Sequence, residues 1–243
     1  MVFLQLKVLQ KGFNYSQDGP GNRLVYHLQG CNLHCPWCSN PESMKINTQG
    51  GTAVEDVVKQ SLAAEPMFFD GGGVTFTGGE PTVQFDALKE VLTHLKNFGI
   101  STAIETNGTS PRLPELFDRV DFLIMDFKHH NSIKLKEYTG VGNETVLKNI
   151  AAASEKRNQL LLRIPLINGF NASPDDAKAF ADVLGPLMKS GFALEVLSYH
   201  EYGRDKWSQN GMEYKMADAF VDENQFTEFC KILKNASIKL IRT

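Results

Sequence analysis

Three of the four cysteines in this sequence lie between positions 31 and 38, in the order Cys31-Asn32-Leu33-His34-Cys35-Pro36-Trp37-Cys38. Protein thiolates bind zinc and iron-sulfur clusters, and such sites usually take four protein ligands. Three thiolates leave one coordination position open, unless His34 completes the site as in a Cys3His zinc knuckle. A ligating histidine usually follows a longer loop, whereas His34 is adjacent to Cys35. The spacing therefore favours an open metal position, at which catalysis can occur.

Six short apolar runs that contain β-branched residues predict the strands that must position these cysteines. The predicted strands are residues 23–29, 74–77, 100–105, 121–125, 160–165 and 192–197. Residues 11–22, which contain several glycines and a proline, are expected to form a turn-rich loop before the first strand. Residues 238–241 predict a short last strand.

Helical spacing of apolar residues predicts helices between these strands. Thr52 and Glu55 suggest a capping box for the first helix, with an apolar face of Val54, Val57, Val58 and Leu62. The second helix carries Leu88, Val91, Leu92 and Leu95 and should end at Gly99. A further helix should begin near Asn143. The helix after that should begin with Ser173 as its cap and Pro174 at its first position. The last helix places Phe226, Phe229, Cys230 and Leu233 on one face, which predicts a buried core thiol at Cys230.

Alternation of strands and helices predicts an α/β fold with parallel βα units. Six units are too few for a closed eight-stranded barrel. We therefore expect a partial (β/α)6 TIM-like barrel, formed by residues 1–243 as a single domain.

Polar residues lie at the end of every one of the six predicted strands. They are the cysteine loop, Gly78-Gly79-Glu80, Glu105-Thr106-Asn107, Asp126 with Lys128, Arg163, and His200. In parallel barrels the carboxyl ends of the strands meet at one face, where the βα loops form the active site. One polar residue at a strand end is usually a solvated turn, but six such groups predict one shared polar site.

Composition excludes several classes of protein. Hydrophobic residues make up 42% of the 243 residues, charged residues make up 22%, and the net charge is -3. This balance does not indicate a nucleic-acid-binding protein. The apolar run 2–9 is short and broken by Lys7, with no small-residue cleavage site after it, so we expect neither a signal peptide nor a membrane span. Clustered cysteines in a cytoplasmic protein more often bind metal than form disulfides.

The cysteine spacing, with an aromatic residue before the last cysteine, resembles the signature of the radical SAM enzymes. A longer series of motifs resembles the glycyl radical enzyme activating enzymes, those of the pyruvate formate-lyase type in particular. The series comprises Asp18-Gly19-Pro20-Gly21, Cys31 to Cys38 with Asn40-Pro41-Glu42, Val74 to Pro81, Thr106-Asn107-Gly108, Asp126-Phe127-Lys128, Tyr138-Thr139-Gly140 and Tyr199-His200. These motifs extend over nearly the whole chain.

The resemblance implies a 4Fe-4S cluster on Cys31, Cys35 and Cys38, with S-adenosylmethionine (SAM) bound to the fourth iron. Reductive cleavage of SAM would give a 5'-deoxyadenosyl radical, which would take a hydrogen atom from a glycine of a partner glycyl radical enzyme. The electron donor would be flavodoxin or a similar protein, and the chain would act as a monomer. Two alternatives stay open: a radical SAM enzyme with a small-molecule substrate, and a zinc-knuckle interaction module.

The resemblance also assigns roles to individual residues. The residues implied to bind SAM are Trp37, Ser39, Gly78, Gly79, Glu80, Thr106, Asn107, Asp126, Lys128, Arg163 and His200. Glu105 and Asp126, with Thr106, match positions that hold a monovalent cation, sodium or potassium, near the SAM carboxylate. Trp37 could instead be core, and Gly78-Gly79 could be a simple turn.

Some positions depart from the family pattern. Asn168 and Ala172 replace a proline and an aspartate of the loop that begins at Arg163, Ser198 replaces a proline, and Glu105 replaces an aspartate. Many activating enzymes insert a module with two further clusters, but no cysteine lies between Cys38 and Gly78, so one cluster is expected. The Asp18 loop, Tyr138 and the long 201–218 segment are expected to form the rim that receives the substrate.

Overall fold

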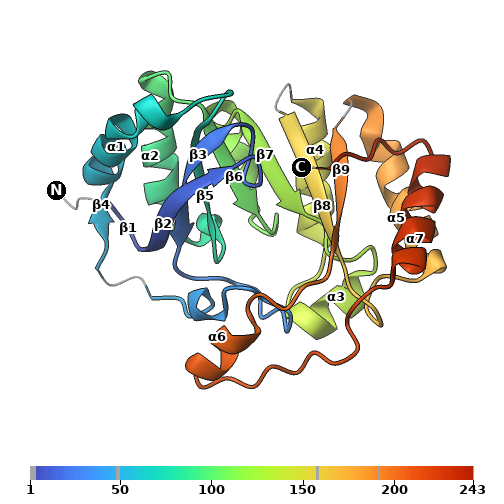
Figure 1. The fold of residues 1–243 in the computed structure, drawn as a ribbon. Coiled ribbons are helices and arrows are strands. Elements are labelled where there is room, and N and C mark those ends of the chain that lie inside the picture. Colours follow the sequence, from blue (N-terminus) through green and yellow to red (C-terminus); the bar gives the residue numbers. More distant parts are fainter. Residues whose placement is uncertain (1–3, 48–49, 157–158, 191, 243) are drawn as a thin grey trace. The chain divides into compact units, whose positions relative to one another are not determined.

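The computed structural model describes residues 4–47, 50–156, 159–190 and 192–242 (Figure 1). The chain divides into two compact units. The first comprises Met1–Asn32, Ser43–Thr106 and Ser110–Ile124, and the second comprises Leu33–Glu42, Asn107–Thr109 and Met125–Thr243. The first two residues of the apolar run 2–9 lie outside the described residues. No helix among the described residues is long and apolar enough to span a membrane.

The first unit contains a mostly parallel sheet with the strand order β2-β3-β5-β6. Its strands are β2 (Val8–Tyr15), β3 (Asn22–Leu28), β5 (Gly73–Gly78) and β6 (Thr102–Thr106). β2 pairs antiparallel with β3, whereas β3 with β5 and β5 with β6 are parallel. A separate antiparallel pair joins β1 (Gln5–Leu6) to β4 (Thr52–Ala53).

Two helices form the crossovers that parallel strands require. α1 (Val54–Ala63) connects β3 to β5, α2 (Phe85–Asn97) connects β5 to β6, and the two helices contact each other (Figure 1). The four predicted apolar residues of α2 are all fully buried. Gly99 follows the helix with φ of +75°, a conformation that glycine adopts without strain. The predicted α2 and its stop are therefore confirmed.

The second unit pairs β8 (Gln159–Leu166) in parallel with β9 (Ala193–Ser198). Its helices are α3 (Ser132–Thr139), α4 (Glu144–Glu155), α5 (Pro174–Leu184), α6 (Arg204–Gln209) and α7 (Glu223–Asn235). α5 connects the two strands and packs against α7 (Figure 1). The boundary between the units falls within β7 (Phe122–Asp126). Short 3-10 helices span Pro41–Ser43, Glu65–Met67, Pro81–Gln84, Leu113–Arg119 and Gly185–Ser190.

The six predicted strands correspond to β3 and β5 to β9, so the predicted α/β class is confirmed. The 11–22 loop prediction is partly wrong, because β2 continues to Tyr15. Most of β2 is exposed, so its sequence lacks the alternation that identifies a half-buried strand. α3, whose sequence has little amphipathic pattern, was also missed.

Three further predictions are wrong. Thr52 pairs with Leu6 as part of β4, and α1 begins at Val54 without a side-chain cap, so there is no Thr52 capping box. Residues 238–241 form a single bridge within the described ranges, between Leu240 and Leu194. Cys230 is partly exposed, because it lies beside the fully buried row of α7 and not within it.

The cap of α5 provides a direct test of the stability of the second unit. Ser173 forms a full capping box with Asp176, so Ser173→Ala should lower the free energy of unfolding by about 1 kcal/mol in urea denaturation. Thr52→Ala is the matched control, because Thr52 makes no cap bond, and it should cost less than about 0.5 kcal/mol. Equal losses in both variants would contradict this account.

Candidate active site

Cys35 and Cys38 lie on a tight turn of the second unit. The Cys38 N–H donates to the Cys35 carbonyl at 3.1 Å, and the Asn40 N–H donates to Cys38 Sγ at 3.4 Å. Cys31 belongs to the first unit, where its N–H donates to the Met44 carbonyl at 3.4 Å. All four cysteines lie in the described part of the chain, and none forms a disulfide.

Competing electrostatic effects act on the Cys38 thiol. Burial raises the pKa of Cys38, because desolvation disfavours the thiolate. The Asn40 N–H and the charges of Lys128 and Lys206 act in the opposite direction and lower this pKa. The site therefore supplies donors and cations to a Cys38 thiolate, although burial outweighs them. A bound metal ion would remove the thiol proton outright.

The segment after β9 holds the cysteine turn in place. Trp207 of α6 donates its indole N–H to the Cys38 carbonyl at 2.9 Å, and Lys206 Nζ lies 2.8 Å from Asn40 Oδ1 and 3.0 Å from Glu42 Oε1. A Cβ on Gly203 would lie 2.5 Å from Ser39 Cα, so the backbones approach closely. Residues 201–218 were predicted to form part of the rim that receives the substrate, but the contacts of Lys206 and Trp207 with the cysteine turn were not predicted. The tryptophan in a polar segment was the available signal.

Trp37 lies in an aromatic cluster of the second unit. Its ring centroid is 4.6 Å from Phe170 and 6.3 Å from Tyr138, and the Phe170 and Tyr138 rings are 4.7 Å apart. Trp37 is buried, and Tyr138 is partly exposed. These contacts fix the ring plane of Trp37. Phe170 was not identified from the sequence, because it follows β8 in an irregular loop.

Charged residues of the second unit form short pairs. Lys128 Nζ lies 2.7 Å from Asp126 Oδ2, as expected for two side chains that alternate by two along a strand end. Arg163 Nε donates to Glu195 Oε2 at 2.9 Å, and both side chains are almost fully buried. These two residues are directly opposite each other in the β8–β9 register. Sequence reasoning missed Glu195, because a single acid within an apolar strand gives no indication of its partner.

Asn171 connects the loops around these pairs. Its Nδ2 donates to the Lys128 carbonyl at 2.8 Å and the Pro165 carbonyl at 2.9 Å, and its Oδ1 accepts the Ile167 N–H. The side chain is fully buried. Asn171 therefore positions the backbone beside Lys128, a role that sequence reasoning did not assign.

In the first unit, Gly78-Gly79-Glu80 forms the turn that ends β5. A Cβ on Gly78 would lie 2.3 Å from the Leu28 nitrogen, and one on Gly79 would lie 2.2 Å from the Gly30 oxygen. Both glycines are thus required by the chain itself, with or without a ligand. The buried Glu80 caps the following 3-10 helix through the Thr82 N–H and also accepts a 2.7 Å bond from the Thr106 hydroxyl.

The remaining predicted residues have separate surroundings. Glu105 Oε2 accepts a 3.0 Å bond from Thr77 in the first unit. In the second unit, Asn107 Oδ1 accepts from the Thr109 N–H and closes a turn. His200 stacks on Tyr202 with centroids 4.2 Å apart, and partial burial lowers the pKa of the imidazole.

A second group of possible metal ligands, His129, His130 and Asp176, is explained by hydrogen bonds of the protein. His129 Nδ1 accepts the Asn131 N–H at 3.0 Å, so Nε2 carries the proton and donates to the Phe170 carbonyl at 3.0 Å. Burial lowers the pKa of His129 to about 4, which keeps the ring neutral. His130 binds Asp176 at 2.8 Å. With both nitrogens of His129 engaged, this cluster has a structural role.

Comparison with known proteins identifies the family. The Radical SAM superfamily model matches residues 25–181. The chain belongs to the radical SAM superfamily. A 4Fe-4S cluster and SAM are the cofactors that this superfamily implies, and the Cys-x3-Cys-x2-Cys spacing of Cys31, Cys35 and Cys38 fits them.

Related radical SAM proteins include activating enzymes. The 4-hydroxyphenylacetate decarboxylase activating enzyme of Clostridioides difficile strain 630 is 30% identical, and the alignment covers 91% of this chain and 90% of the relative. The pyruvate formate-lyase-activating enzyme of Staphylococcus aureus strain USA300 is 29% identical over 86% of each chain. The first alignment has 289 positions, more than the 243 residues of this chain, so it contains gaps opposite residues that this chain lacks.

Solved radical SAM structures agree with this result. A domain of pyruvate-formate lyase-activating enzyme from Bacteroides vulgatus ATCC 8482 aligns with a TM-score of 0.57 and 28% identity over 70% of this chain and 98% of that domain. A radical SAM methyltransferase from Sphaerobacter thermophilus aligns with a TM-score of 0.68 and 16% identity over 94% of this chain and 67% of that chain, and it supports the fold alone. These matches agree with the predicted partial-barrel fold of the radical SAM type.

The contact between Trp207 and the cysteine turn should slow the loss of a bound cluster, so a variant without this contact should lose the cluster faster. Trp207→Phe keeps the ring but removes the donor to the Cys38 carbonyl, a bond worth about 1 kcal/mol. Iron-sulfur absorbance of the reconstituted protein should then decay about fivefold faster in air. Tyr202→Phe, an exposed ring in the same segment, is the control and should leave the decay unchanged. Identical decay in both variants would argue against the contact.

Proposed function

We propose that this chain is a glycyl radical enzyme activating enzyme, which uses one 4Fe-4S cluster and SAM to remove a hydrogen atom from a glycine of a partner enzyme. The observation that carries the proposal is the similarity to named activating enzymes over about nine tenths of the chain. The ion pairs of Lys128 and Arg163 and the hydrogen-bonded cysteine turn support the proposal, because they give the predicted residues defined orientations.

Cys31, Cys35 and Cys38 would each bind one iron. When bound, the cluster supplies the electron that cleaves SAM and so provides the radical chemistry. The residues of this chain provide binding and orientation. Asn40 and the cations Lys128 and Lys206 favour the thiolate of Cys38, while Trp207 fixes its carbonyl.

Charge complementarity supports the proposed SAM contacts. Lys128 and Arg163 would bind the SAM carboxylate, and each is held by an acid, Asp126 and Glu195 respectively. The Trp37 ring, fixed by Phe170 and Tyr138, would lie beside the adenine with Ser39. Gly78, Gly79, Glu80, Thr106, Asn107 and His200 would complete the binding site.

A monovalent cation on Glu105, Asp126 and Thr106 is part of the proposal. Glu105 and Asp126 each keep a polar partner, Thr77 and Lys128, which orients the carboxylates. The resemblance to activating enzymes of the pyruvate formate-lyase type supports the assignment. The identity of the ion, sodium or potassium, would be found by titrating SAM binding in each salt.

We also propose the cellular setting. The partner is a glycyl radical enzyme, and the electron donor is flavodoxin or a protein of similar chemistry. The chain acts as a cytoplasmic monomer and as one radical SAM domain with one cluster.

The function is tested anaerobically with dithionite-reduced protein, SAM and either pyruvate formate-lyase or 4-hydroxyphenylacetate decarboxylase. Electron paramagnetic resonance should show a glycyl radical on one partner, and that signal should be absent when the partner's radical glycine is replaced by alanine. Formation of 5'-deoxyadenosine without a radical on either partner would instead favour a small-molecule substrate. Zinc without iron after reconstitution would favour the zinc-knuckle module.

The cysteine assignment gives a matched set of variants. Replacement of Cys31, Cys35 or Cys38 by alanine should abolish cluster binding, because the remaining two thiolates cannot hold the open-iron site. Cys230→Ala is the control and should retain the wild-type iron and sulfide content, since Cys230 lies on α7. Loss of iron in the control variant would show that the cluster ligands are wrongly assigned.

Glu195 is proposed to position Arg163 for SAM. Glu195→Gln keeps the shape but removes the charge that holds the guanidinium, so the Kd of SAM should rise about tenfold, equivalent to about 1.4 kcal/mol. At saturating SAM the rate should be nearly unchanged, which a general loss of structure would not give. Glu195→Asp should restore part of the affinity, and Glu213→Gln, an exposed acid, should have no effect. A fall in rate at saturating SAM, with unchanged affinity, would contradict the assignment.

A further inference from the structure

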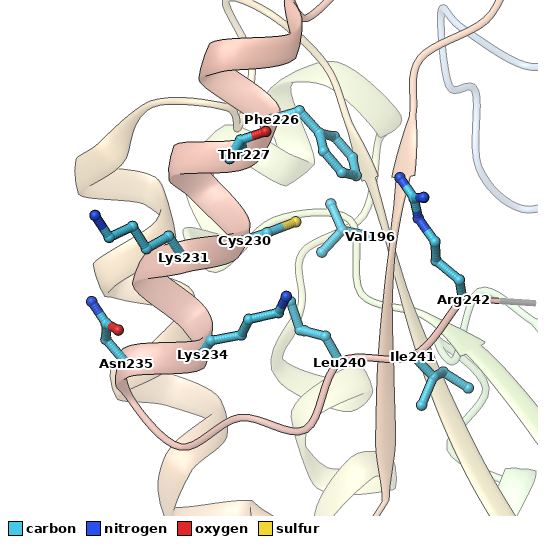
Figure 2. Close-up of a pocket in the computed structure, with 10 residues that line it drawn as sticks. All are labelled: Val196, Phe226, Thr227, Cys230, Lys231, Lys234, Asn235, Leu240, Ile241 and Arg242. Carbon is cyan, nitrogen blue, oxygen red and sulfur yellow. The ribbon is translucent and has the colours of Figure 1, made fainter.

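A cavity lies in the second unit between α7, β9 and the C-terminal segment (Figure 2). Its volume is about 620 Å³, within the range typical of small-molecule sites. The lining residues are Val196, Phe226, Thr227, Cys230, Lys231, Lys234, Asn235, Leu240, Ile241 and Arg242. None of the residues assigned to SAM or the cluster is among them.

The C-terminal segment borders this cavity through Leu240, Ile241 and Arg242. In the described part of the chain, the segment pairs with β9 at Leu194, whose N–H donates to the Lys239 carbonyl at 3.0 Å and whose carbonyl accepts the Ile241 N–H at 2.9 Å. Val196, two residues further along β9, lies on the same face as Leu194 and lines the cavity. The opposite wall is a row of α7 spaced by four residues, Phe226, Cys230 and Lys234 (Figure 2).

The cavity combines an apolar surface with positive charge. Val196, Phe226, Leu240 and Ile241 provide the apolar part, and none of the ten lining residues, all within the described ranges, is acidic. Lys234 and Arg242 form no ion pair with any described residue. Both cations act on the Cys230 thiol, where they oppose the rise in pKa that burial causes. An anionic group placed near Cys230 would therefore be attracted by two side chains at once.

This cavity is separate from the residues proposed to bind SAM. Side chains alternate between the two faces of a strand, so Glu195 projects opposite to Leu194 and Val196. Glu195 is bonded to Arg163, whereas Val196 faces α7. A ligand here would not compete directly with SAM for Arg163.

We propose that this cavity binds a small molecule that carries a carboxylate on an apolar chain. The carboxylate pairs with Lys234 and Arg242, and the apolar chain covers Val196, Phe226, Leu240 and Ile241. Arg242 offers the planar fork that matches a carboxylate, and Lys234 adds a second charge. The volume of about 620 Å³ lies in the range of small-molecule sites and favours a small molecule over a protein partner.

The test uses decanoate as the probe and the anaerobically reconstituted protein. Isothermal titration should show binding of decanoate at a one-to-one ratio. Binding should also protect Cys230 from N-ethylmaleimide, measured by peptide mass spectrometry, because the thiol lies in the cavity wall. Lys234→Gln with Arg242→Gln should weaken binding at least tenfold. Val196→Phe, which fills the cavity and keeps both charges, should also weaken binding.

Lys178→Gln is the matched control, because Lys178 lies on α5, outside the cavity lining, and its Nζ pairs with Asp175 at 2.9 Å. Its affinity for decanoate should stay within twofold of the wild-type value. Equal binding of decanol would overturn the proposal, since the charges would then have no role. An equal loss in Lys178→Gln, or binding to phosphatidylglycerol vesicles without binding of free decanoate, would also overturn it. Melting temperatures of all variants, followed by circular dichroism, would show whether each one is folded.

Discussion

The candidate site depends on one constraint, the need of an irregular, partly buried turn for hydrogen-bond partners. Residues 33–42 contain almost no regular structure, so their polar groups must be satisfied by other segments. The Cys38 carbonyl takes its bond from Trp207, a residue 169 positions later in the chain. The ammonium group of Lys206 donates hydrogen bonds to the side chains of Asn40 and Glu42. The geometry of the turn is thus set by α6, and α6 therefore also fixes the positions of any metal ligands on the turn.

The charged residues of the second unit follow from the same principle. Buried charges are tolerated when each is paired and hydrogen-bonded. Arg163 and Glu195 meet this condition because the β8–β9 register places them opposite each other. Lys128 is paired with Asp126, and its carbonyl is bonded by Asn171. Such pairing lowers the freedom of the cationic groups, which favours binding of an anionic ligand in a fixed orientation.

In the first unit, the Gly78-Gly79-Glu80 turn is held by close contact between backbone segments and not by pairs of charges. Gly78 and Gly79 leave no space for a side chain beside Leu28 and Gly30. Glu80 is then held by Thr82 and Thr106, so the end of β5 is connected to the end of β6. The glycines of this motif are explained by packing alone, and the case for a ligand here rests on the family.

The sequence by itself determined the α/β class, the six strands β3 and β5 to β9, the cap of α5 and the family of the chain. These depend on local patterns, since hydrophobic spacing, capping residues and cysteine spacing are read within a few positions. The exposed strand β2 and the weakly amphipathic α3 were missed for the same reason, because neither has a clear apolar pattern. Only the tertiary structure decided that Trp207 holds Cys38, that Glu195 holds Arg163, and that Cys230 faces a cavity. Those contacts join residues far apart in the chain, and their partners are chosen by strand register and by the path of loops, which local sequence does not encode.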